Sequence, residues 1–163
     1  MLRRNRALIV ACLAPWLAVA LSGCATPPAP GGGVVERISF RPSPPPFCGR
    51  CETTAFTVGA DGEVRIEKGY WAGSYRDWRI RRTVKHVTAE QFAAFKRRLA
   101  AYKPAGDVLE GERGCQSYLS DNDGVVVEWS GDGEARRRVF DFGCLDDRAM
   151  NETVRGAPSV LGL

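Results

Sequence analysis

Six cysteines and a single histidine are the residues of this 163-residue chain with the widest chemical repertoire. A thiolate acts as a nucleophile, binds zinc or exchanges with a disulfide, whereas paired thiols in an oxidising compartment form structural disulfides. The compartment and the spacing of the cysteines decide between these roles. The cysteines are Cys12, Cys24, Cys48, Cys51, Cys115 and Cys144.

The N-terminal segment has the features of an export signal. Three arginines within the first six residues precede the apolar stretch 7–21, which is shorter than the roughly 20 apolar residues of a spanning helix. The stretch ends in Leu21-Ser22-Gly23-Cys24. This boundary resembles the lipobox of bacterial lipoproteins, where small residues fit the signal peptidase and the thiol accepts a diacylglycerol. We therefore expect residues 1–23 to be a cleaved signal peptide and Cys24 to carry the lipid anchor, with fatty acids such as palmitate.

The organisation of the mature chain follows from composition. Residues 24–33 comprise the lipidated cysteine and a Pro- and Gly-rich tether, and we expect residues 34–163 to form a single globular domain. Ala25, rather than an aspartate, follows the lipidated residue, which by analogy with lipoprotein sorting favours the outer membrane, facing the periplasm. Signal removal leaves 20 basic and 19 acidic residues, a balance that gives no electrostatic argument for a nucleic-acid partner.

Alternating apolar residues predict strands in the first half of the domain. We expect a first strand over residues 34–40, ended by prolines at positions 42 and 44–46. A hairpin follows, with Gly59-Ala60-Asp61-Gly62 at its turn and Phe56 and Val64 among its apolar positions. We expect residues 69–75 to form a loop and residues 78–84 to form another strand.

The second half contains the clearest helix signal. Thr88 and Gln91 form a capping-box pattern, and an apolar stripe at spacings of three and four runs from Phe92 to Tyr102. Residues 125–129 and 136–142 predict a second hairpin, and residues 146–155 a short closing helix with Gly156 and Pro158 as its stop. We therefore predict an α+β fold, in which an antiparallel sheet of about five strands packs on one main helix, with a short C-terminal helix.

Four cysteines remain in the exported domain, and they allow three disulfide pairings. The simplest pairing joins Cys48 to Cys51 as a local clip and Cys115 to Cys144 as a long-range staple. Zinc is an alternative, but a tetrahedral site usually has two close pairs of ligands, and Cys115 and Cys144 are far apart. Thiol–disulfide exchange is the other alternative, because Phe47-Cys48-Gly49-Arg50-Cys51 is similar to the thioredoxin active-site segment. A strand pattern after Cys51 favours the structural clip, since a reactive cysteine usually lies at a helix N-terminus.

A cluster of aromatic and cationic residues is the candidate binding surface. Such residues stack on sugars or hold peptides through cation–π contacts, although a strand with a core tryptophan and solvated arginines explains them too. The cluster comprises Tyr70, Trp71, Tyr75, Arg76, Trp78 and Arg79.

The remaining candidate residues favour structural interpretations over functional ones. His86 is the only histidine, and we expect a surface or capping role for it. Residues 121–124 resemble the centre of a calcium loop, but Leu119 and Ser130 stand where the loop needs carboxylate ligands, so we expect a polar turn. The three arginines at 136–138 read as a solvated strand edge. We predict no catalytic residues, no metal site and no cofactor.

The order of motifs from Glu36 to the C-terminus resembles an uncharacterised bacterial lipoprotein domain family, the domain-of-unknown-function family numbered 6438. The residues that carry the resemblance are Cys48-Gly49-Arg50-Cys51, Asp61-Gly62, Gly69, the stripe Phe92, Phe95, Leu99 and Tyr102, and Ser120-Asp121. The cysteine spacing is one residue shorter than in the family, Glu52 replaces a usual proline, and Asp123-Gly124 replaces another. The resemblance implies that the chain is exported and has the architecture predicted above. It implies no activity, because the family has none assigned.

Two classes of function follow from these observations. The first is a membrane-anchored envelope lipoprotein whose domain is a non-enzymatic binding or scaffolding module. Its partners would be the membrane, through the lipid, and an envelope protein or glycan, without nucleic acid. The alternative is a thiol–disulfide redox protein that uses Cys48 and Cys51.

Overall fold

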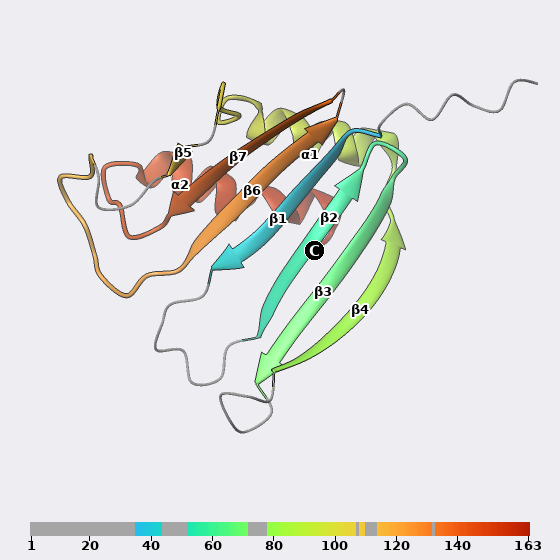
Figure 1. Cartoon of the computed structure of the whole chain (residues 1–163), viewed down its shortest axis with the longest axis horizontal. Helices are drawn as coiled ribbons and strands as arrows, with labels where there is room; N and C mark the ends of the chain where they lie inside the picture. The colour runs from blue at the N-terminus through green and yellow to red at the C-terminus, as the bar shows by residue number, and fades with distance from the viewer. Residues whose placement is uncertain (1–34, 44–51, 72–77, 107, 110–113, 132) are drawn as a thin grey trace, which may run out of the picture. The chain divides into compact units, whose positions relative to one another are not determined.

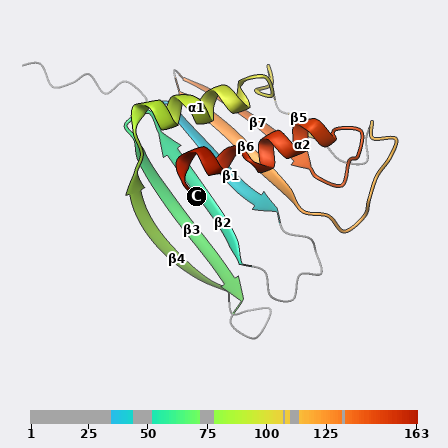
Figure 2. The ribbon, with the colours of Figure 1, turned by 180° about the vertical axis from the view of Figure 1, so that it is seen from behind.

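In the part of the chain that the structure describes, one sheet of seven strands carries the helices on a single face (Figures 1 and 2). The computed structural model describes residues 35–43, 52–71, 78–106, 108–109, 114–131 and 133–163. The elements in chain order are β1 (Arg37–Ser43), β2 (Thr53–Gly59), β3 (Glu63–Trp71), β4 (Trp78–His86), α1 (Ala89–Ala100), β5 (Val108–Leu109), β6 (Gly124–Gly131), β7 (Glu134–Asp141), α2 (Arg148–Arg155) and the 3-10 helix η1 (Ala157–Leu161).

The strand order is β4-β3-β2-β1-β6-β7-β5. Strands β1 to β4 form an antiparallel meander, α1 then crosses the sheet, and the β6–β7 hairpin joins the free side of β1. Only β5, two residues long, pairs in parallel, with β7. The predicted α+β fold, an antiparallel sheet packed on one main helix with a short C-terminal helix, is therefore confirmed, and the main helix has 12 residues. The described sheet has seven strands where about five were expected.

The core lies between the helices and the face of the sheet that we call the inner face. Alternate strand residues point to this face, because successive side chains of a strand lie on opposite sides of the sheet. The helices contribute an apolar stripe from α1 and three residues near the C-terminus. The core residues are Ile38, Phe40, Phe56, Val58, Val64, Ile66, Phe92, Phe95, Leu99, Val125, Val127, Trp129, Phe140, Val154, Ala157 and Leu161.

Local interactions set the start of α1 as the sequence predicts. The hydroxyl of Thr88 accepts a hydrogen bond from the Gln91 amide at 3.1 Å, and the Gln91 side chain accepts one from the Thr88 amide at 2.9 Å. This capping box satisfies two amides that no helical carbonyl reaches. Gln91 also donates to the carbonyl of Val160 at 3.4 Å, which ties the start of α1 to η1.

The predicted end of the first strand is wrong. We expected residues 34–40 and a break at the prolines, whereas β1 runs to Ser43 and includes Pro42, which lies opposite Val125 of β6. The pairing of β1 with β2 ends at Phe40, so β1 has only one neighbour beyond that point. A proline, which has no N–H to donate, is tolerated in a strand that is open on one side.

The predicted loop at residues 69–75 is also wrong in its first part. Gly69, Tyr70 and Trp71 continue β3, because β4 pairs with them through Trp78, Arg79 and Ile80. Strand β4 confirms the expected strand at 78–84 and extends it to His86. Its Ile80 and Val84 are 54% and 60% exposed, since they lie on the outer face, opposite the helices.

The C-terminal segment is more regular than its sequence predicts. Gly156 ends α2, but Pro158 does not stop the chain from coiling, since it sits in the first turn of η1, where its missing N–H costs nothing. Residue Leu161 of η1 is fully buried against α1 and the sheet. No helix among the residues described here is long and apolar enough to cross a membrane.

Candidate functional site

A half-open cavity of about 480 Å³ lies between the inner face of the sheet and the C-terminal end of η1. This volume falls within the roughly 300–1,000 Å³ of typical ligand pockets. Its lining comes from β1, β2, β3, β4 and the C-terminal segment, which are far apart in sequence. The lining residues are Phe40, Thr54, Phe56, Ile66, Lys68, Lys85, Pro158, Gly162 and Leu163.

The floor of the cavity is apolar and rigid. The rings of Phe40 and Phe56 stack with centroids 5.2 Å apart and planes inclined by 12°. On its other side Phe56 contacts Phe95 of α1, with ring centroids 5.7 Å apart. Because the core holds these rings in place, the floor is preformed. An apolar group that binds to a preformed surface avoids the free-energy cost of ordering that surface first.

Two lysines stand at the sides of the cavity. Lys85 donates hydrogen bonds to the carbonyls of Leu161 at 2.8 Å and Gly162 at 3.2 Å, so its ammonium is fixed beside the end of η1. Lys68 forms an ion pair of 3.5 Å with Glu52, and both side chains are at least half exposed. An exposed pair of this length contributes little to stability, so Lys68 remains accessible to an anion.

The predicted aromatic and cationic surface is described only in part. Tyr70 and Arg79 lie directly opposite each other in β3 and β4, and Tyr70 is 42% exposed. The backbones of Trp71 and Trp78 are also paired. The side chains of these two tryptophans lie outside the described part of the chain, as do Tyr75 and Arg76 entirely. This surface stays a prediction, and the backbones of its described residues lie at one end of the β3–β4 pair.

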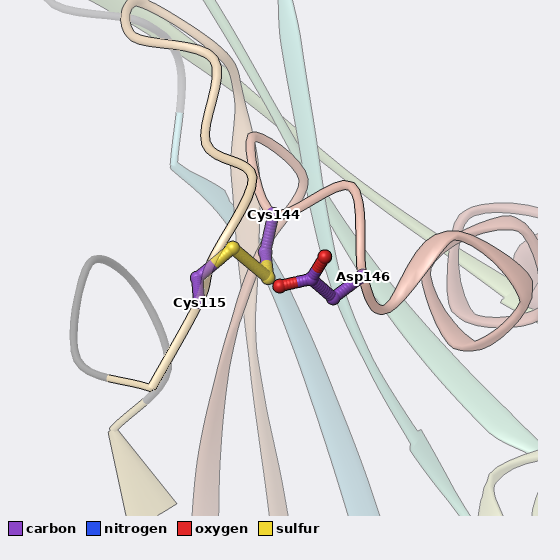
Figure 3. A group of neighbouring side chains, drawn as sticks. All are labelled: Cys115, Cys144 and Asp146. Atoms are coloured by element: carbon purple, nitrogen blue, oxygen red, sulfur yellow. A yellow bond between two sulfur atoms is a disulfide. The ribbon is translucent and has the colours of Figure 1, made fainter.

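A disulfide joins Cys115 to Cys144, with a Cα–Cα distance of 5.8 Å (Figure 3). It is the staple expected in the simplest pairing. The two sulfur atoms and a carboxylate oxygen of Asp146 lie within 4.8 Å of one another. This group is not a metal site in the oxidised protein, because the thiolate is the form of cysteine that binds metals.

Asp146 has a structural role beside the disulfide. Its carboxylate accepts hydrogen bonds from the amides of Gln116 and Ser117, the latter at 3.3 Å. Leu145 in turn donates to the Ser117 carbonyl at 2.9 Å. The disulfide and these bonds together hold the loop before β6 against the connection from β7 to α2.

The other predicted cysteines lie outside the described residues. These are Cys24, the expected lipidation site, and Cys48 and Cys51, the expected clip. Strand β2 begins at Thr53, two residues after Cys51, so the segment that follows the pair is a strand, as the sequence predicts. A helix N-terminus, the usual means of stabilising a catalytic thiolate, does not follow Cys51.

The remaining candidates have ordinary structural roles. His86 ends β4 on the surface, opposite Glu63. In the predicted polar turn, the carboxylate of Asp123 accepts a hydrogen bond from Arg155 of α2 at 3.0 Å. The expectation of a solvated edge at residues 136–138 fails at Arg138, which lies over the ring of Phe140, with its guanidinium carbon 4.9 Å from the centroid.

The cavity is the feature that sequence reasoning missed. Phe40, Phe56 and Ile66 read as core residues, and nothing in their spacing distinguishes a residue covered by a helix from one that lines a hollow. Comparison with known proteins adds no assignment: no protein-family model matches the chain, and no curated protein matches it.

Proposed function

We propose that this chain is a lipid-anchored lipoprotein of the cell envelope whose domain is a non-enzymatic binding module. The observation that carries the binding role is the cavity between the sheet and η1, with its floor of Phe40, Phe56 and Ile66. Apolar cavities of this size with a few polar groups at the rim are the usual form of a ligand site. The residues that line it include no histidine, cysteine or acidic side chain, which supports binding over acid–base catalysis.

The anchor is the second part of the proposal. The basic start, the apolar stretch and Leu21-Ser22-Gly23-Cys24 support export and lipidation, and Ala25 supports the outer membrane, facing the periplasm. A tether over residues 25–33 would hold the domain within about 30 Å of the headgroups. The family resemblance belongs to the same proposal, since that family consists of exported lipoproteins.

Two changes test the anchor. Replacement of Cys24 by serine removes the lipid acceptor, so unprocessed precursor should accumulate and the protein should no longer partition into detergent. Radiolabelled palmitate should mark the wild type and not the variant. The matched control is Cys12→Ser, within the apolar stretch, which should leave processing and labelling unchanged. Normal processing and labelling of Cys24→Ser would refute the lipoprotein assignment.

The binding role is tested in the native envelope by site-specific photocrosslinking. A photoreactive amino acid at Thr54, which lines the cavity, should capture a ligand that the same group at Arg97, on the exposed side of α1, does not. The adducts are identified by intact mass and by peptide mapping. If both positions give the same pattern, the cavity is not the binding site.

A further inference from the structure

Four cations lie on the inner face of β3 and β4, next to the cavity. Cross-strand partners in an antiparallel sheet share a face, and Arg81 lies opposite Lys68, while Arg79 lies opposite Tyr70. Lys85 follows on the same face of β4, opposite Val64. Lys68 in turn lies opposite Thr54 of β2, so one row across three strands leads from Arg81 to the cavity.

Of these four cations, Lys68 alone has an ion-pair partner among the described residues, the exposed Glu52 just before β2. The inner-face positions of β2, β3 and β4 include no Asp or Glu, and like charges directly opposite each other, as Lys68 and Arg81 are, destabilise a sheet. The outer face is different: there Arg82 forms an ion pair of 2.8 Å with its cross-strand partner Glu67. Strands β3 and β4 thus carry an ion pair of opposite charges on the outer face and a group of like charges on the inner face.

The arginines of this cluster are open to an incoming anion. Arg79 and Arg81 are exposed, and within the described ranges neither has an ion-pair partner. The ammonium of Lys85 uses two of its three N–H donors for the carbonyls of η1. The lower ends of β3 and β4 extend beyond the helices that lie on the inner face (Figure 2).

We propose that this site binds a single-chain amphiphile with an anionic head group. The hydrocarbon chain would lie in the cavity over Phe56 and Ile66, and the carboxylate or phosphate head would lie between Lys68 and Arg81. The inference rests on the proposed binding function and names its ligand class. A neutral sugar or a nucleic acid fits less well, because the former does not need the cations and the latter does not need the apolar floor.

Binding is measured with the mature chain that carries Cys24→Ser, exported with a non-lipoprotein signal so that its disulfides form. The probes, each kept below its micelle concentration, are dodecanoate and dodecyltrimethylammonium, which have the same chain and opposite charge. Calorimetric titration should show one site for dodecanoate and binding of the cationic probe that is weaker by about tenfold or more, as expected for reversing a charge beside two cations. Lysophosphatidylglycerol in a third arm distinguishes a phospholipid head from a fatty-acid head.

Three variants assign the roles of the residues. Arg81→Ala should weaken dodecanoate binding roughly fivefold, whereas Arg82→Ala, its neighbour on the outer face, should leave it unchanged. Thr54→Phe fills the cavity and should abolish binding of either probe. Each variant is first checked by circular dichroism and thermal unfolding, and Lys68→Ala replaces any variant that does not fold.

The outcomes separate this inference from the function on which it rests. Equal binding of the two probes, lost in Thr54→Phe, would overturn the anionic head group and leave a cavity for apolar chains. Equal effects of Arg81→Ala and Arg82→Ala would overturn the assignment of the head-group site. Absence of binding by any probe would overturn the amphiphile altogether, while crosslinking from Thr54 in the envelope would still report on the binding function.

Discussion

At the scale of single residues, Asn151 is the buried polar side chain on which the C-terminal segment depends. Its amide nitrogen donates to the carbonyl of Cys144 at 3.0 Å and to that of Asp141 at 3.3 Å. The residue is 6% exposed, so water does not replace these bonds. One side chain thereby joins α2 to the end of β7 and to the half-cystine of the disulfide.

Substitution of Asn151 should therefore be costly. Asn151→Ala removes the side-chain donor to the buried Cys144 carbonyl and one of the two donors to the Asp141 carbonyl, which the Cys144 amide also contacts at 3.2 Å, and we expect a loss of about 1–3 kcal/mol in the free energy of unfolding. Asn151→Asp keeps the shape but directs carboxylate oxygens at those carbonyls, so its loss at neutral pH should be larger. Urea unfolding of the three proteins measures both values. A smaller loss for the aspartate variant would contradict the hydrogen-bond assignment.

The disulfide is the second residue-scale determinant of stability. It closes a loop with a sequence separation of 29, which the chain-entropy relation converts to roughly 3–4 kcal/mol. Cys115→Ser should lose about that amount, and more than Cys51→Ser, whose predicted partner Cys48 closes a much shorter loop. Denaturant unfolding under oxidising conditions provides the comparison. Equal losses in the two variants would indicate a different pairing.

At the scale of elements, the β2–β3 turn supports the connection from β4 to α1. The carbonyl of Gly62 accepts a hydrogen bond from the Val87 amide at 2.9 Å, and Gly62 itself has a φ of 80°. A methyl group on Gly62 would lie 2.6 Å from the Val87 carbonyl oxygen. Both the backbone conformation and the close contact require glycine at this position.

A pair of alanine substitutions separates these two requirements. Gly114 has a similar φ of 84°, but an added methyl group there meets no described atom within 4 Å. Gly114→Ala should cost roughly 1–2 kcal/mol for the left-handed conformation alone. Gly62→Ala should cost more, since the turn must also move away from Val87. Thermal unfolding of both variants tests this, and equal losses would show that the contact is unimportant.

Elements defined by local patterns were predictable from sequence. The capping residues Thr88 and Gln91 and the stripe from Phe92 to Leu99 lie within one segment, so their spacing alone predicts α1. The course of β1 through Pro42 was not predictable, because it depends on where β2 stops pairing. Pairing between strands that are distant in sequence determines where such a strand ends, and the local sequence pattern does not reveal this pairing.

At the scale of the whole molecule, the same limit applies to the candidate site. The alternation in β2 and β3 predicts which residues face inward, but not that the helices leave part of the inner face open. That depends on the position of η1, a helix that the sequence pattern did not predict. The outward position of Ile80 and Val84 has the same origin, since the strand pattern does not say which face receives the helices.

The choice between a binding module and a redox protein is also a property of the whole molecule. A catalytic dithiol needs an accessible cysteine with a stabilised thiolate and a disulfide less stable than structural ones. Cys144 is 3% exposed, which shields its sulfur from attack, and a strand follows Cys51. These two observations favour a structural role for both predicted disulfides.

The oxidised protein should therefore contain no titratable thiols and should not catalyse disulfide exchange. We expect a reduction potential below about −300 mV for the Cys48–Cys51 clip, in the range of structural disulfides. The measurement is equilibration with glutathione and dithiothreitol buffers, together with turnover of insulin as a disulfide substrate. Cys48→Ser/Cys51→Ser is the control, and it should match the wild type in turnover. A potential between about −270 and −120 mV with turnover that this control abolishes would make the chain an oxidoreductase, because only an unstable, accessible disulfide cycles in this way.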